Sequence, residues 1–182
     1  MKIDIDDSQA AKKLSRQAFI VSDKNLKRAE VRSVNRALRG ARTEISRAIR
    51  KGYRMKSSDI KDAMTLKRAS ATQSTPTGII RIEDKPLPII RFGSPNQTRG
   101  GLSVTVRRGR RQTIKSGFIV ESMGGHAFIR TSEDSLPIRK LFGPSARMLA
   151  PFAIKKSKGA VDERMVKEFD RNVNREIRKA WR

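Results

Sequence analysis

The sequence contains no cysteine and a single histidine, His126, among its 182 residues. Disulfide bonds and thiolate metal sites are therefore excluded, and no histidine-based metal motif is present. No run of about 18 apolar residues occurs, and the first residues lack the apolar stretch of a secretion signal. We therefore expect neither a membrane span nor export, and the composition fits a cytoplasmic product.

Recognisable catalytic motifs are also missing. The sequence has no phosphate-binding loop, no dinucleotide-binding glycine pattern and no Gly-x-Ser-x-Gly elbow. Acidic pairs such as Glu83 and Asp84 occupy adjacent positions, whose side chains diverge on a helix or strand. We therefore predict no catalytic residue, no metal and no cofactor. A two-metal nuclease would need carboxylates that are distant in the sequence to converge.

Acidic residues are scarce, with 18 against 42 basic ones and a formal charge of +24. The excess is spread evenly, at +7 in residues 1–50, +6 in 51–100, +6 in 101–150 and +5 in 151–182. The charge therefore belongs to the folded body rather than to a tail, which suits nucleic acid or acidic protein partners. The length and the 36% hydrophobic content predict one domain, residues 1–182.

A helix with two contrasting faces is predicted from about Asp23 to Gly52. Its apolar face, at about 100° per residue, comprises Val34, Ala37, Leu38, Ala41, Ile45, Ala48 and Ile49. The opposite face carries Arg28, Arg32, Arg36, Arg39, Arg47 and Arg50. Because Glu30 and Glu44 lie off this stripe, neighbouring arginines repel by about 0.2–0.5 kcal/mol per pair. An anionic partner would relieve that repulsion.

A second helix, from Val161 onward, repeats the arrangement. Its apolar positions are Met165, Phe169, Val173, Ile177 and Ala180, and its cationic positions are Arg164, Lys167, Arg171, Arg175, Arg178 and Arg182. Glu168 lies near the edge of this stripe, and the other acidic residues lie off it. Each stripe is either a solvated face or a contact surface for a polyanion. Two stripes of one sign in the same chain favour the polyanion.

The pattern of elements predicts an α+β fold in which 1–64 is helical, 65–130 is β-rich, and 131–182 is a connector with the C-terminal helix. In the first part, Ser8 begins a brief helix that reaches Ala18, and Ser57 or Ser58 caps a short helix over Asp59 to Met64. The predicted strands are Leu66–Ala69, Ile79–Ile82, Ile89–Phe92, Leu102–Val106, Thr113–Val120 and Ala127–Arg130. Short loops favour antiparallel pairing, and we expect the apolar helix faces to cover one face of a single small sheet.

The connector leads into a short helix that starts at Pro144, followed by a basic linker, Lys155–Gly159. Before this helix, two prolines limit the conformations of a segment that offers Leu141 and Phe142 between basic residues. This segment is either a docking element for a partner or a loop that covers a sheet edge. Its candidate docking residues are Pro137, Ile138, Leu141, Phe142, Gly143, Pro144 and Ser145.

A third cationic feature is a turn formed by Arg107, Arg108, Gly109, Arg110 and Arg111. Glycine permits the positive φ of a tight turn, so this run predicts a charged hairpin tip, which is also suited to phosphate contact. Aromatic residues make up 5% of the chain and few lie near the basic positions. We therefore expect contact with the nucleic-acid backbone, without base stacking or sequence readout.

Several segments carry a family resemblance when they are read in order. Those near the first helix are Asn35-Arg36-Ala37-Leu38, Ala41-Arg42-Thr43, Arg47, Ile49-Arg50, Tyr53, Lys56 and Asp59-Ile60, and those further along are Pro86-Leu87-Pro88, Gly117-Phe118-Ile119 and the run from Leu136 to Ser145. Together they resemble the phage minor tail protein Z family, over most of the chain.

This resemblance implies a non-enzymatic structural role at the head-proximal end of a long phage tail, alongside the tail terminator. It implies other tail proteins as partners (the terminator, the tube or the tape measure), a ring of copies around genomic DNA, and a place in the virion after assembly in the host cytoplasm. Related tail-completion proteins have a long helix on a small antiparallel sheet. The alternatives are a free, sequence-independent nucleic-acid-binding protein and, third, a nuclease packaged with the DNA.

Overall fold

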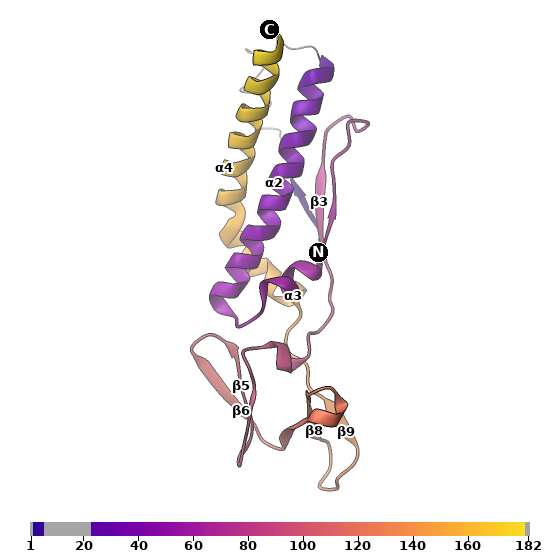
Figure 1. Ribbon diagram of the computed structural model, residues 1–182, viewed down its shortest axis with the longest axis vertical. Coiled ribbons are helices and arrows are strands. Elements are labelled where there is room, and N and C mark those ends of the chain that lie inside the picture. Colours follow the sequence, from indigo (N-terminus) through magenta and orange to yellow (C-terminus); the bar gives the residue numbers. More distant parts are fainter. Residues whose placement is uncertain (1, 6–22, 181–182) are drawn as a thin grey trace. The chain divides into compact units, whose positions relative to one another are not determined.

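The computed structural model describes residues 2–5 and 23–180, with side chains from 23 to 179 (Figure 1). Its α-helices are α2 (Asp23–Gly52), α3 (Ser57–Asp62) and α4 (Ala146–Ala180). Its strands are β1 (Lys2–Ile5), β2 (Met64–Lys67), β3 (Gly78–Ile82), β4 (Asn96–Thr98), β5 (Gly101–Arg107), β6 (Arg110–Ile114), β7 (Gly117–Val120), β8 (His126–Arg130) and β9 (Ile138–Lys140). Helices combined with antiparallel strands confirm the predicted α+β class.

The strands form three separate three-stranded antiparallel sheets, in the orders β1-β3-β2, β4-β5-β6 and β7-β8-β9. The expectation of a single sheet is therefore wrong for the described residues. Thr113–Val120, expected as one strand, is divided between β6 and β7, and Ser116 between them adopts a positive φ of 58°. Because the chain turns there, the two strands join different sheets.

The chain divides into two compact units. Unit 1 comprises Met1–Ile45, Met64–Ile82 and Ile154–Arg182, and unit 2 comprises Ser46–Ala63 and Glu83–Ala153. Each unit combines segments that are far apart in the sequence, and α2 and α4 contribute residues to both. The single domain expected from the length stays a prediction.

In unit 1, α2 covers one face of the β1-β3-β2 sheet. Alternate residues of β3, namely Gly78, Ile80 and Ile82, are buried, as expected for a strand with one covered face. At Gly78 the strand approaches α2 closely, because a Cβ atom there would lie 3.2 Å from side-chain atoms of Val34 and Leu38. All seven apolar positions predicted on α2 are buried, which confirms that this face is core.

In unit 1, α4 also runs beside α2 (Figure 1). Ala29 of α2 packs in a buried cluster with Phe169 of α4. The side-chain amide of Asn172 donates hydrogen bonds to the Ser33 hydroxyl at 3.0 Å and to the Glu168 carbonyl oxygen at 2.7 Å. The buried surface of α2 therefore extends beyond the predicted apolar stripe, through small residues, to the border of the arginines.

Unit 2 holds the other two sheets and a core that includes Phe92, Leu102, Val104 and Phe128. Residues Ile89–Arg91, expected as part of a strand, instead form a 3-10 helix. Pro88 precedes this turn with a φ of −53°, and its carbonyl oxygen accepts a hydrogen bond from the Arg91 N–H. Proline sets φ and removes a ladder donor, which explains why the apolar run does not continue as a strand. The short strands β4 and β9 were not expected, because polar or proline-flanked triplets carry little β signal.

The C-terminal helix is longer than expected, since the predicted linker Lys155–Gly159 lies inside α4. Buried residues recur at four-residue steps across the basic run, at Ala153, Ser157 and Val161. Because lysine is a good helix former and Ser157 continues the buried seam, the run does not interrupt the helix.

Two predicted helix starts are also corrected. Ser145, not Pro144, immediately precedes α4, and its hydroxyl accepts a hydrogen bond from the Met148 N–H at 3.3 Å, as an N-cap does. At α3 the N-cap is Lys56 and no side chain caps the helix, so the predicted serine cap is wrong. The brief helix predicted to begin at Ser8 lies outside the described residues.

The buried face of α2 generates a test of the core. Leu38 is 0% exposed, so Leu38→Asp should lower the free energy of unfolding by about 3–5 kcal/mol, because it buries an uncompensated charge. Arg28→Asp, at an exposed position of the same helix, is the control and should melt close to the parent protein. Thermal denaturation followed by circular dichroism measures both, and native-like melting of the Leu38 variant would contradict the assignment.

Candidate functional site

Every described member of the two predicted cationic stripes is exposed. On α2 these are Arg28, Arg32, Arg36, Arg39, Arg47 and Arg50, and on α4 they are Arg164, Lys167, Arg171, Arg175 and Arg178. Arg182 lies outside the described residues. The structure therefore supports the separation of charged and buried faces, whereas contact with DNA or an acidic partner stays a prediction.

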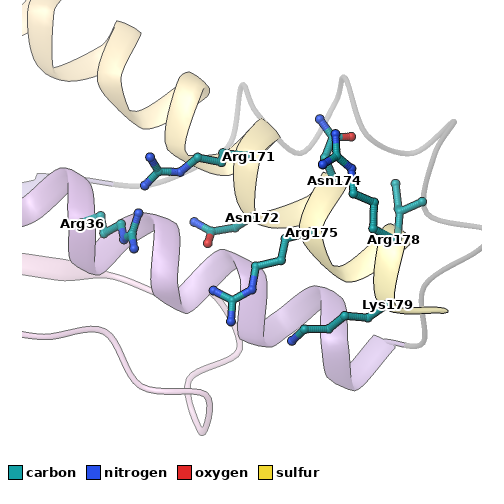
Figure 2. A pocket seen from close by; sticks show the side chains of 8 residues that line it. Arg36, Arg171, Asn172, Asn174, Arg175, Arg178 and Lys179 are labelled. Atoms are coloured by element: carbon teal, nitrogen blue, oxygen red, sulfur yellow. The ribbon is translucent and has the colours of Figure 1, made fainter. Parts of the chain in front are cut away.

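Part of the two stripes converges on clefts between α2 and α4 in unit 1. The larger cleft has a volume of about 870 Å³, and its lining includes Arg36 from α2 and Arg171, Arg175, Arg178 and Lys179 from α4. Figure 2 shows Arg175 and Lys179 extending from α4 toward α2, with Arg36 on α2. Two stripes on separate helices are thus combined into one cationic surface. We call this cleft, together with the smaller one that adjoins it, the α2–α4 cleft.

An adjoining cleft of about 380 Å³ shares Arg36, Asn172 and Arg175 with the larger one and adds Arg32, Asn35, Arg39 and Arg68. Arg68 was not among the predicted contact residues, because it follows a short strand rather than a helical stripe. The Asn35 side chain holds this region, accepting a hydrogen bond from the Ala69 N–H at 2.9 Å and donating one to the Ala69 carbonyl oxygen at 3.1 Å. Nothing in the sequence indicates this contact, because an asparagine within a helix does not indicate which distant backbone group its side chain will bond.

Two carboxylates of α4 form ion pairs with this surface. Glu168 contacts Arg36 at 3.2 Å and Arg171 at 2.6 Å, and Glu176 contacts Arg32 at 2.7 Å. The repulsion expected among the α2 arginines is therefore partly relieved within the chain. Periodicity along one helix could not show this, because the compensating acids lie on the other helix.

Glu176 is the more deeply placed of the two carboxylates, with a side chain only 5% exposed. Burial raises the pKa of Glu176, but hydrogen bonds from Lys179 and Arg32 together with their positive charges outweigh it, and the pKa falls below its ordinary value of 4.5. Glu176 therefore ties the two helices together as an ionised residue.

Arg164 lies against α2 rather than simply pointing to solvent. Gly40 is buried, and a Cβ atom built there would lie 2.4 Å from Cδ and 2.6 Å from Nη1 of Arg164. The arginine side chain therefore passes over α2 at a position without a side chain, and packing contributes to its role.

The cationic turn in unit 2 is a hairpin tip, as predicted. Arg107 of β5 pairs with Arg110 of β6 across a turn in which Gly109 has a φ of 75°. Arg108 donates through Nε to the Arg50 carbonyl oxygen at 2.6 Å, near the end of α2. Arg111 donates through Nε to the Ser103 hydroxyl at 2.5 Å. Two of the four arginines thus have structural partners, while all four stay exposed.

The predicted docking segment is braced on both sides in unit 2. Ile138 belongs to β9, which pairs with β8. Leu141 accepts a hydrogen bond from the Ile89 N–H at 3.0 Å, and the Gly143 N–H donates to the Leu87 carbonyl oxygen at 2.8 Å. Gly143 also lies against a buried ring, since a Cβ atom there would be 2.5 Å from a ring carbon of Phe92.

Exposure differs along the docking segment. Pro137 is exposed, Phe142 is 51% exposed, and Ile138, Leu141, Gly143 and Pro144 are partly buried. Ser145 is buried, and its hydroxyl donates to Asp84 at 2.5 Å. Phe142 is therefore the exposed apolar side chain that a rigid backbone presents. The structure shows a braced loop that exposes Phe142, and docking of a partner on this segment stays a prediction.

Within residues 2–5 and 23–180, no three or more His, Asp or Glu side chains lie close enough together to hold a metal ion. No helix in these ranges is both long enough and apolar enough to cross a lipid bilayer.

A comparison with protein families identifies the chain. The model of the family described as prophage minor tail protein Z (GPZ) matches residues 8–182. The chain belongs to the prophage minor tail protein Z family. Membership gives it a structural role in a phage tail, with other tail proteins as partners and the virion tail as its location. Neither the curated proteins nor the solved structures gave a match.

The environment of Glu176 generates a prediction about pH. Because its folded pKa is lowered, the ionised form adds stability above about pH 4.5, and this stability is lost as pH falls through the folded pKa. Glu176→Gln should lower the free energy of unfolding at pH 7 by about 1–2 kcal/mol, a range that allows for the half-exposed cationic partners. The deficit should shrink below about pH 4.5.

Glu163→Gln is the matched control, because it removes the same charge at an exposed site on the same helix. Urea unfolding at a series of pH values measures the three proteins. A deficit that stays constant down to pH 3, or that appears equally in the control, would contradict the assigned ion pairs.

Proposed function

We propose that this protein completes the head-proximal end of a long phage tail, as a non-enzymatic virion protein that assembles into a ring around genomic DNA. The family match over residues 8–182 is the observation that carries the proposal. The α2–α4 cleft adds physical support, since arginine and lysine side chains from two helices converge there. In a ring, such a surface would meet the DNA that passes through the tail.

The partners in this proposal are copies of the chain, the tail terminator, and the tube or tape measure, with assembly in the host cytoplasm. A surface for one neighbour is offered in unit 2 by Phe142, which is held between the hydrogen-bonded residues Leu141 and Gly143. Preorganised backbone around an exposed aromatic lowers the entropy lost on docking. A protein neighbour is therefore the proposed ligand of this segment, and DNA is the proposed ligand of the α2–α4 cleft.

A second candidate is a free nucleic-acid-binding protein without sequence preference. It is favoured by the same cationic cleft, which does not by itself require a virion. The two candidates differ in location, because a tail-completion protein should be found in purified particles at a defined end of the tail. Gold labelling of purified virions distinguishes them, and neighbouring genes for tube, terminator and tape measure would favour the first.

The completion role predicts the phenotype of a deletion. A strain that lacks this protein should produce tails and filled heads but few infectious particles, because the unfinished tail end does not yield a working virion. Electron microscopy of the lysate and plaque titre measure the two parts, and expression of the intact chain in trans is the control. A normal titre from a clean deletion would reject an essential completion role.

The docking surface predicts a different phenotype for Phe142→Ser. The variant should stay folded and melt no more than about 5–10 °C below the parent, because about half of the Phe142 side chain is already exposed. Its incorporation into tails should nevertheless fall several-fold. Met123→Ser is the matched control, since Met123 and Phe142 are 52% and 51% exposed. If Phe142→Ser unfolds, the Phe142 side chain is part of the core. If the variant is incorporated into tails normally, Phe142 does not lie in the interface.

A further inference from the structure

Glu168 is held between arginines of two helices. Its carboxylate oxygen Oε2 accepts a hydrogen bond from Nη1 of Arg36 at 3.2 Å and another from Nη2 of Arg171 at 2.6 Å. The Glu168 side chain is 19% exposed, whereas those of Arg36 and Arg171 are 43% and 59% exposed. One anionic oxygen is therefore shared by two guanidinium groups that both reach solvent, and both arginines line the α2–α4 cleft.

Two guanidinium groups that converge on one anionic oxygen form the arrangement by which arginine binds phosphate. In this protein the oxygen belongs to the chain itself. Within residues 23–179, eight cationic side chains line the two adjoining clefts, and two carboxylates, Glu168 and Glu176, form ion pairs with them. Positive charge is therefore in excess. The two internal carboxylates do not neutralise it, so an added anion would still be attracted to the clefts.

The lining favours a sugar–phosphate backbone as the occupant. Among the residues that the structure describes, those that line the clefts include no aromatic side chain and one apolar side chain, Ile177. Protein interfaces centre on apolar and aromatic anchors, and single-stranded nucleic acids stack on aromatic rings. Neither kind of anchor is present among these residues, which leaves contact with phosphates as the main interaction.

The cations also repeat in a way that suits a repeating anion. Those on α2 are Arg32, Arg36 and Arg39, and those on α4 are Arg171, Arg175 and Arg178. Steps of three or four residues separate successive arginines by about 5 Å along each helix. A polymer of phosphates can contact several of these groups at once, whereas a single small anion contacts one or two.

We infer that the α2–α4 cleft binds the phosphate backbone of duplex DNA, and that Glu168 is an internal competitor occupying one phosphate position in the free protein. The choice of duplex DNA rests on the proposed function. When DNA binds, a phosphate oxygen replaces the Glu168 carboxylate between Arg36 and Arg171. The Glu168 side chain then turns to the solvent that it already partly reaches.

Glu176 does not share this role. Its side chain is 5% exposed and pairs with Arg32 and Lys179, so removing its charge disturbs the contact between the helices. The two carboxylates of the cleft are therefore distinguishable: one stabilises the helix pair, and the other limits binding.

The test measures binding of the full-length protein to a short mixed-sequence DNA duplex over a range of salt concentrations. Glu168→Gln should bind more tightly than the parent, because one additional phosphate contact steepens the log–log salt dependence by about 0.9, or about eightfold in affinity at 0.1 M salt. Glu163→Gln removes the same charge from an exposed site about 140° around the helix. This control should keep the parent slope.

A double-mutant cycle keeps the inference falsifiable. Arg36→Gln combined with Arg171→Gln should weaken binding and flatten the slope, since glutamine preserves the helix while it removes both charges. In that double-variant background, Glu168→Gln should not increase the affinity for DNA further. The phosphate position that opens when the carboxylate is removed no longer has its two guanidinium donors. Circular dichroism of each variant confirms that the helices are intact.

Each outcome decides the question. Equal gains from Glu168→Gln and Glu163→Gln would show a general charge effect and overturn the competitor role, as would a gain that persists without Arg36 and Arg171. If Glu168→Gln increases the affinity for poly-glutamate but not for DNA, the DNA assignment is overturned in favour of an acidic protein. A normal titre after deletion would reject the completion role and leave these binding results unaffected, so the two proposals can fail separately.

Discussion

The close contact between α2 and α4 in unit 1 is the constraint on which the charged surface depends. Small and polar residues make it possible, because Ala29 packs beside Phe169 and the Asn172 amide reaches the Ser33 hydroxyl. The buried Asn172 amide favours one register between the helices, since a shift would leave the donor that reaches the Ser33 hydroxyl unpaired. Without that register, the arginines of the two helices would lie on separate surfaces.

The same contact determines how charge is distributed. Arginines that border a helix interface can pair with acids on the neighbouring helix, and Arg32 and Arg36 do so with Glu176 and Glu168. These pairs do not neutralise the surface, because more cations than carboxylates line the clefts. The arrangement holds like charges together in the free protein while it retains a net attraction for polyanions.

Amphipathic periodicity was sufficient to predict α2 and its buried face, because a 30-residue helix offers many turns over which the pattern repeats. Its ends were predicted from Asp23 and Gly52. Periodicity also predicted which arginines are exposed. It could not predict that Ala29 and Ser33 would pack against α4, since small residues give a weak signal, nor that Glu168 would bridge two helices. The strands of three or four residues were the least predictable, because so short a run has almost no period.

The family resemblance predicted the class of protein, and the family match confirms it. The sequence did not predict the division into three sheets. That division depends on turns such as the one at Ser116, where a non-glycine residue adopts a positive φ just before Gly117. A Ser-Gly pair inside a β-rich run marks a turn but does not show that the next strand joins another sheet. The sequence therefore did not show that β6 and β7, adjacent along the chain, belong to different sheets.

The passage of Arg164 over Gly40 has a consequence for how this protein can change over evolutionary time. A side chain at position 40 would occupy space now held by the arginine, so any larger residue there requires the arginine to move or to be shortened. Positions 40 and 164 are far apart in the sequence, yet they form one steric pair. Among relatives of this chain, we expect their residue identities to vary together, with a bulkier residue at one accompanied by a smaller residue at the other.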